Sequence, residues 1–252
     1  MPLKTGDYFI LYHQDKKYLL SLKEEIFHTH KGSINLSELK GKEYGEKVIS
    51  SAGESFYILK PTLFDFIMKL KRITQIIYPK DLGYILLKMG VKEGKIFIEC
   101  GAGSGALTCV LAYLVGDEGQ VISYEKEEKF LKVAQENVMR LGLEKRVIFK
   151  LKEVKEFFDE ENVDGIFLDV KEPWNLLEAA YKALKGGHPL GILVPTTNQV
   201  TQTLSVLTRW PFVDVEVVEI LLRSYKTNPE RLRPTDQMVA HTGYLIFAKK
   251  VL

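Results

Sequence analysis

An apolar run followed by alternating glycines constrains the fold of this chain more than any other feature. Residues 95–105 have the sequence KIFIECGAGSG, so that Gly101, Gly103 and Gly105 follow the run directly. An apolar run that ends in glycines is typical of a buried parallel strand, and residues 106–113 have the apolar composition of a helix that follows it. Glycines allow a tight turn and a close approach of ligand to backbone. We therefore expect an α/β fold with a nucleotide-cofactor loop.

Acidic residues near this loop narrow the choice of cofactor. The glycine spacing also fits the dinucleotide pattern Gly-x-Gly-x-x-(Gly/Ala), because Ala106 stands at its last position. Glu99, however, would repel a pyrophosphate and suits a ligand with an ammonium and a sulfonium, such as S-adenosylmethionine. Glu125 ends the next strand-like stretch about 20 residues beyond the glycines, where a carboxylate accepts ribose hydroxyls. The alternative is that Glu125 merely opens the helix expected over residues 126–141.

The composition restricts which cellular compartment and which binding partners we expect for this chain. The net charge of +2 over 252 residues is not the strong basic field that indicates nucleic-acid binding by itself, so an RNA site would be a local patch. Two cysteines, Cys100 and Cys109, are too few for a disulfide framework or a zinc site and favour the cytoplasm. We expect no signal peptide and no membrane span, since apolar stretches of roughly 20 residues are lacking. His28 and His30 alone make a poor metal site, so we expect no metal.

The chain divides into three regions by pattern. Short β-branched and aromatic runs separated by turn sequences predict a small N-terminal β-domain over residues 1–60. Residues 61–94 contain two helical stretches, 63–70 and 79–89, which we expect to form linking helices and a lid segment. Residues 95–252 alternate strand-like and helical runs, which predicts a doubly wound parallel sheet. Its expected strands are residues 96–100, 121–125, 147–151, 165–170 and 190–194, closed by an antiparallel hairpin of residues 213–222 and 243–249.

The candidate catalytic residue is Asp169, at the end of one expected strand. Ligands of open parallel sheets bind beyond the carboxyl ends of the strands, and a carboxylate there is costly unless it is paired or faces a cleft. The alternative role of Asp169 is to cap the helix expected near Trp174. The Trp174 side chain would either stack on a base or fill the core. Residues 72–81 (RITQIIYPKD) form either a lid or an exposed linker. The basic loop 223–233 suits phosphate contacts or is simply solvated.

Five segments together resemble the TrmI-type tRNA (adenine-N1)-methyltransferases, which modify adenosine 58 of the T-loop and, in some archaeal members, also position 57. The glycine loop is generic, but the other four together are specific, and the resemblance covers nearly the whole chain. It implies a class I S-adenosylmethionine-dependent methyltransferase, with a Rossmann-like seven-stranded sheet, an antiparallel last strand and a small N-terminal β-domain. It also implies tRNA as the substrate and a homotetramer. The segments are residues 72–81, 99–105, 168–174 (LDVKEPW), 195–200 (PTTNQV) and 241–245 (HTGYL).

The resemblance also implies roles for individual residues. Asp169 would lie beside the target base, and Tyr78 near the catalytic pocket. Cys100 replaces a usual alanine or serine, and Phe130 stands where some eukaryotic relatives have a basic cofactor contact, but neither change removes catalytic chemistry. Non-catalytic RNA-binding subunits lose the glycine loop and the acid, and this chain keeps both. The implied cofactor residues are Gln75, Gly101, Gly103, Ser104, Gly105, Leu107, Glu125 and Asp169, with Glu153 and Val154 near the adenine.

The implied reaction is in-line attack of adenine N1 on the methyl carbon of the sulfonium. Asp169 would be hydrogen-bonded to the exocyclic amino group of the adenine, which would be flipped out of the T-loop. A class I methyltransferase acting on a protein or a small metabolite is one alternative, and it would work without RNA. An RNA-binding partner subunit is another, and it would bind tRNA without methyl transfer. Amino-group adenine methyltransferases use a compact acid-Pro-Pro-aromatic loop, whereas three residues separate Asp169 from Pro173 here.

Overall fold

The chain forms two compact units, each with its own hydrophobic core. The computed structural model describes residues 2–252, and the units span Met1–Lys69 and Leu70–Leu252. The segment 61–94 crosses this boundary, because helix α1 (Leu63–Met68) belongs to the first unit and helix α2 (Pro79–Met89) to the second. No helix within residues 2–252 combines the length and the apolar content needed to cross a membrane.

The first unit is a small β-structure. Strands β2, β1, β6 and β5 form an antiparallel sheet in that order, and β3 and β4 form a separate hairpin. Alternate residues of β1 and β6 face one core, among them Phe9, Leu11, Phe56 and Ile58. His28 is exposed on the short strand β3. The strands are β1 (Tyr8–His13), β2 (Lys16–Ser21), β3 (Ile26–Thr29), β4 (Gly32–Asn35), β5 (Lys47–Ile49) and β6 (Ser55–Leu59).

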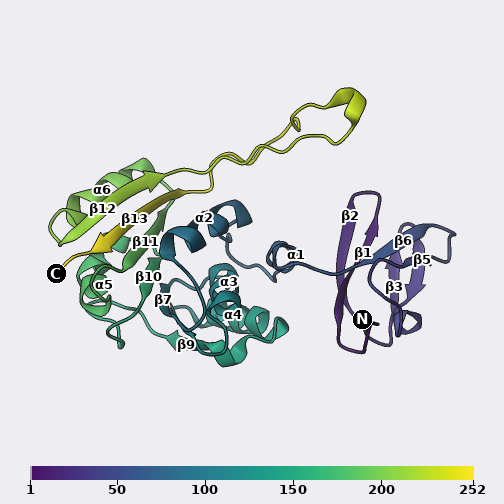
Figure 1. The fold of residues 1–252 in the computed structure, drawn as a ribbon, viewed down its shortest axis with the longest axis horizontal. Coiled ribbons are helices and arrows are strands. Elements are labelled where there is room, and N and C mark those ends of the chain that lie inside the picture. Colours follow the sequence, from purple (N-terminus) through teal and green to yellow (C-terminus); the bar gives the residue numbers. More distant parts are fainter. Residues whose placement is uncertain (1) are drawn as a thin grey trace. The chain divides into compact units, whose positions relative to one another are not determined.

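The second unit is built on a seven-stranded sheet, which confirms the expected α/β class (Figure 1). The strand order is β12-β13-β11-β10-β7-β8-β9, and β13 alone runs opposite to the other six strands of this sheet. The strand expected over residues 165–170 is shorter, because β10 ends at Leu168. The strands are β7 (Ile96–Cys100), β8 (Gln120–Glu125), β9 (Val147–Leu151), β10 (Gly165–Leu168), β11 (Pro189–Val194), β12 (Phe212–Val218) and β13 (Tyr244–Lys250).

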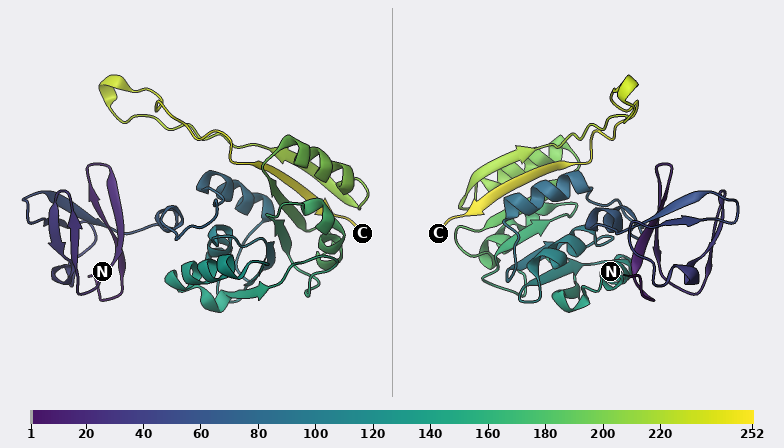
Figure 2. Two further views of the ribbon diagram at one scale, coloured as in Figure 1. Left: turned by 180° about the vertical axis from the view of Figure 1, so that it is seen from behind. Right: turned by 45° about the vertical axis from the view of Figure 1, so that its right-hand side comes forward.

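Helices cover both faces of this sheet (Figure 2). Ile98, Ile122 and Ile166 align across neighbouring strands and pack with α5 and α6 in one buried cluster. The opposite face meets α2, where a Cβ at Gly191 would lie 2.6 Å from the Phe167 ring and 2.9 Å from the Met89 sulfur. Successive side chains of each strand thus fill two cores. The helices are α3 (Ala106–Val115), α4 (Glu128–Arg140), α5 (Leu177–Ala183) and α6 (Thr197–Leu207).

A long segment between the last two strands projects from the sheet (Figures 1 and 2). We call residues 219–243 the arm. The arm contains one short 3-10 helix, Pro229–Arg231, and carries exposed apolar side chains that include Leu232 and Val239. Strands β12 and β13 pair directly on either side of it, as expected for a closing hairpin.

Candidate active site

A cleft of about 720 Å³ lies at the carboxyl ends of strands β7 to β10. It adjoins a recess of about 20 Å³, and Gln75, Gly101, Gly103 and Asp169 line both. This is where an open parallel sheet binds its ligands. Of the other expected residues, Glu125, Glu153 and Val154 line the cleft, Ser104 and Leu107 line the recess, and Tyr78 and Gly105 line neither.

The glycine turn brings the ends of β7 and β10 together. Gly101 has a φ of +99°, and a Cβ there would lie 2.1 Å from the carbonyl oxygen of Asp169. Only glycine permits this approach. Gly105 has a different role, because a Cβ there would lie 3.0 Å from the Cα of Ala134 in α4. Gly101 therefore shapes the cleft, whereas Gly105 lets α3 pack closely against α4.

Glu125 is held by the backbone on both sides. Its Oε2 accepts a hydrogen bond from the Gly103 N–H at 3.0 Å, and its Oε1 accepts one from the Glu127 N–H at 3.0 Å. A carboxylate has about four acceptor sites, so lone pairs remain for hydroxyl donors in the cleft. Helix α4 begins at Glu128, so the Glu125 carboxylate bonds no N–H group within the helix. This argues against the alternative that Glu125 serves only to start that helix.

Glu99 is a buried acid beneath the turn. Its Oε2 accepts hydrogen bonds from the hydroxyls of Thr108 and Ser123. Burial, aided by the negative charges of Asp169 and Glu125, raises its pKa to about 8 despite these two hydrogen bonds. Glu99 is therefore mostly protonated at neutral pH, in contrast to the ionised carboxylate that the sequence suggested. Its contacts join β7, α3 and β8 below the recess.

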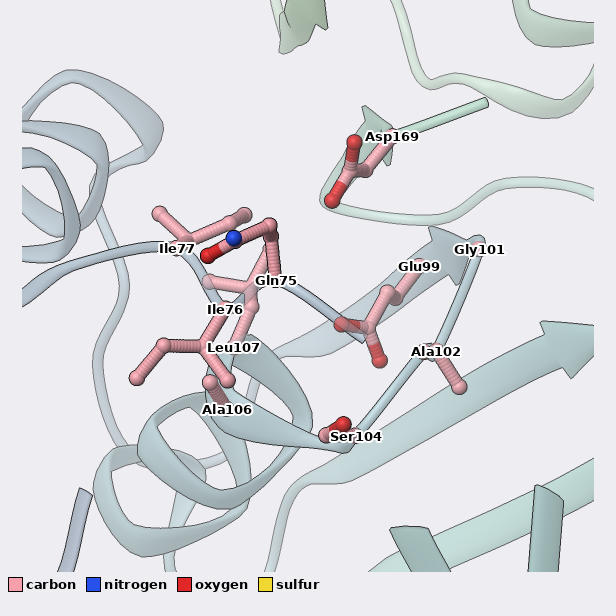
Figure 3. A pocket seen from close by; sticks show the side chains of 11 residues that line it. Gln75, Ile76, Ile77, Glu99, Gly101, Ala102, Ser104, Ala106, Leu107 and Asp169 are labelled. Atoms are coloured by element: carbon pink, nitrogen blue, oxygen red, sulfur yellow. The ribbon is translucent and has the colours of Figure 1, made fainter. Parts of the chain in front are cut away.

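Asp169 faces the recess from the end of β10, with Gln75 on another side of it (Figure 3). Its carboxylate accepts no hydrogen bond from residues 2–252 and is open to solvent. The surrounding chain still hinders hydration, which raises its pKa to about 7, and the negative charge of Glu125 contributes. Asp169 caps no helix, because the 3-10 helix at Trp174 spans Pro173–Leu176 and its N-cap is Glu172. Trp174 is half-buried and lines neither cavity.

Residues 73–78, which we call the strap, cover the glycine turn. The N–H groups of Ile73 and Thr74 donate to the Ser104 Oγ at 3.3 and 3.2 Å, and the two hydroxyls of Thr74 and Ser104 lie 2.7 Å apart. The Ser104 hydroxyl is thus bonded to the strap. Gln75 and the next two residues line the recess, so this segment is a cover and not an exposed linker.

The loop between β9 and β10 forms the other side of the cleft and is anchored by Tyr124. The Tyr124 hydroxyl donates to Glu160 Oε2 at 2.6 Å and accepts from the Asp159 N–H at 3.0 Å. Lys150 forms ion pairs with both acids. No local sequence pattern indicates this anchor, because it joins residues 35 and 36 positions apart. It fixes the segment that carries Val154.

We expect Tyr124→Phe to lower the free energy of unfolding by about 1–3 kcal/mol, because the Asp159 N–H and the Glu160 carboxylate lose a buried partner. Chemical denaturation measures this change. Tyr113→Phe is the matched control, since Tyr113 is an exposed tyrosine of α3. Equal stabilities of the two variants would contradict the anchoring role.

Metal ligands do not gather in this part of the molecule. Within residues 2–252, no group of three or more His, Cys, Asp or Glu side chains is placed to hold a metal ion. Cys100 and Cys109 are free and buried, and burial raises the pKa of both thiols.

Comparison with known proteins agrees with this geometry. The family model GCD14, described as tRNA methyltransferase complex GCD14 subunit, matches residues 54–236. A tRNA (adenine(57)-N(1)/adenine(58)-N(1))-methyltransferase TrmI of Methanocaldococcus jannaschii is 35% identical, over 93% of this chain and 91% of that protein.

Two solved structures share the fold over nearly the full length. A SAM-dependent O-methyltransferase from Thermotoga maritima is 49% identical with a TM-score of 0.94, covering 99% of this chain and 95% of that one. The tRNA (m1A58) methyltransferase TrmI from Aquifex aeolicus is 40% identical with a TM-score of 0.88, covering 100% of both. By the family match and by these identities, the chain belongs to the GCD14 family of tRNA methyltransferase subunits.

Proposed function

We propose that this chain uses S-adenosylmethionine to methylate N1 of adenosine 58 in the T-loop of tRNA. The observation that carries the proposal is the carboxylate of Asp169, which faces the recess without a protein partner and has a pKa of about 7. Relatives over most of the chain are named for this reaction, in one case with position 57 as well. A methyl transfer to a ring nitrogen leaves positive charge on the base, and a free carboxylate suits that charge.

The cleft fits the cofactor in size and charge. Its volume of about 720 Å³ lies in the range of small-molecule sites. Glu125 offers free lone pairs to ribose hydroxyls, and Val154 and Phe130 provide apolar lining. The negative charges of Glu125 and of ionised Asp169 favour a ligand with positive charge. A Cβ at Gly101 would close the approach to the turn.

The roles of the residues are part of the proposal. Ser104 and Gly105 act indirectly, the first by holding the strap and the second by seating α3 on α4. Tyr78 precedes α2 and acts at the border of the catalytic pocket. The residues that hold the methionine and ribose parts are Gln75, Gly101, Gly103, Leu107 and Glu125, and those beside the adenine are Glu153 and Val154.

Bound S-adenosylmethionine supplies an electrophilic methyl group. Asp169 accepts a hydrogen bond from the exocyclic amino group of the target adenine and orients N1 toward the methyl donor. Its negative charge stabilises the positive charge that develops on the ring, and its carboxylate accepts the proton that the amino group releases. Because N1 lies on the pairing edge, the nucleotide enters the site flipped out of the T-loop.

A pH dependence follows from the pKa of Asp169. The cationic sulfonium favours the ionised carboxylate, which dominates above pH 7, so affinity for S-adenosylmethionine should rise as the pH increases from 6 to 8. The change expected from this one group is about tenfold, and it should be smaller for S-adenosylhomocysteine, which lacks the sulfonium charge. Calorimetry with both ligands measures the difference. If Asp169→Asn retains the full difference, Asp169 is not its source.

We also propose that the chain forms a homotetramer and acts in the cytoplasm. Exposed apolar side chains on the arm support assembly, because surfaces of this kind usually mark an interface. The two free buried cysteines agree with a reducing compartment. Light scattering of the purified chain tests the assembly, and a monomeric mass would contradict it.

A second candidate function is methylation of a hydroxyl on a small molecule. It is favoured by the Thermotoga maritima relative, which is named a SAM-dependent O-methyltransferase. Labelled cofactor, an unmodified tRNA transcript and a transcript with guanosine at position 58 distinguish the two. We expect label only in the transcript that has adenosine 58. Equal labelling of both transcripts, or no labelling of either, would contradict the proposed function.

A further inference from the structure

Residues far apart in the sequence meet at the base of the arm. The Lys80 ammonium donates to the Ile220 carbonyl and to the Thr242 hydroxyl, each at 2.6 Å, and pairs with Asp81 at 2.8 Å. The Thr242 hydroxyl in turn donates to Asp81 Oδ2 at 2.8 Å. The Lys80 and Asp81 side chains are only 7% and 2% exposed. A buried, hydrogen-bonded ion pair thus joins the first turn of α2 to both legs of the arm.

A second set of contacts holds the base of the arm in place. The ring of His241 lies between Glu219 Oε1, 2.7 Å from Nδ1, and the Pro195 carbonyl, 2.7 Å from Nε2. A carboxylate and a carbonyl both accept hydrogen bonds, so this position suits a protonated ring that donates from both nitrogens. These bonds raise the pKa of His241. The arm is therefore fixed to the end of β11 as well as to α2.

The strap is held between the glycine turn and the base of the arm. Its first residues bond to Ser104, and its last residue, Tyr78, accepts hydrogen bonds through its carbonyl from the Asp81 and Leu82 N–H groups at 2.9 Å. The strap has no helix or strand of its own. The position of Gln75 beside Asp169 therefore depends on these two anchors.

We propose that Lys80 and Thr242 are positioning residues for methyl transfer, which hold the strap at the recess and connect it to the arm. Only the expected change in kcat rests on the proposed function; the anchoring of the strap does not. A small displacement of a residue that positions the substrate lowers the rate steeply, by about 10²-fold for 1 Å. We therefore expect that loss of the Thr242 hydroxyl slows methyl transfer without unfolding the protein.

Thr242→Val in the full chain tests the inference, because valine keeps the shape and removes the hydroxyl. We expect kcat for tRNA methylation to fall about 10- to 100-fold and amide hydrogen exchange in residues 73–78 to accelerate with S-adenosylhomocysteine bound. Thr242→Ser should restore both values. Thr208→Val is the matched control, because the Thr208 hydroxyl bonds only the Ser205 carbonyl at the exposed end of α6. Lys80→Met, as a second variant, should accelerate the same amides.

The outcomes separate the inference from the proposed function. Unchanged exchange in the strap of Thr242→Val, or an unchanged kcat, would overturn the positioning role. A lower kcat that serine does not restore, or a change in oligomeric mass without faster exchange in the strap, would also overturn it. If the wild-type chain transfers no methyl group to tRNA, the proposed function fails, whereas the exchange experiment still decides whether the strap is anchored at Thr242.

Discussion

Asp169→Asn is expected to lower kcat for tRNA methylation about 10³-fold. Asparagine keeps the size of the side chain but cannot carry the negative charge or accept the proton. Because this interaction forms mainly in the transition state, affinity for S-adenosylhomocysteine should stay largely intact. Single-turnover kinetics with labelled cofactor measure the first effect, and calorimetry measures the second.

Glu172→Gln is the matched control for this variant. Glu172 is an exposed acid that lines the cleft but not the recess. We expect that its loss changes kcat little, since its side chain does not line the recess that Asp169 faces. An Asp169→Asn variant as active as the Glu172→Gln variant would remove Asp169 from the mechanism.

Gly101→Ala is expected to abolish cofactor binding and to destabilise the second unit. The new methyl carbon would lie 2.1 Å from the Asp169 carbonyl oxygen, and the φ of +99° is strained for alanine. Backbone strain of this kind costs about 1–3 kcal/mol, and relief of the overlap must separate the ends of β7 and β10. Thermal unfolding and titration with S-adenosylhomocysteine measure both effects.

Gly83→Ala is the control for this change. Gly83 lies within α2, has no positive φ, and a Cβ there meets nothing within 4 Å. Alanine is expected to stabilise the helix by about 0.4–1 kcal/mol. If Gly101→Ala also binds the cofactor normally and unfolds at the wild-type temperature, the close approach of the two strand ends does not shape the site.

Much of the sheet could be predicted from the sequence, because its signals are local. Apolar runs before the glycine turn and before Glu125 and Asp169 predict buried strands, and parallel strands bring their carboxyl ends to one edge of a sheet. The closing hairpin was also predicted, since no helical pattern separates its strands. The helix α6 was not, because its sequence, TNQVTQTLSVL, is largely polar and carries only a weak apolar stripe.

The contacts that join distant residues could not be predicted. The hydroxyl of Ser104 bonds to the strap, Gly105 is needed for packing against α4, and Glu99 is a buried acid. Each of these depends on partners that only the fold brings near. The Lys80–Thr242 contact links residues 162 positions apart, so neither side chain signals it alone. Local periodicity locates the site, and tertiary packing determines the state of its residues.

Mass-spectrometric mapping of tRNA after incubation with the chain and S-adenosylmethionine tests the central claim most directly. We expect one added methyl group on N1 of adenosine 58 and its loss with Asp169→Asn. A methyl group on the exocyclic nitrogen, on a ribose, or on no nucleotide of the T-loop would contradict it.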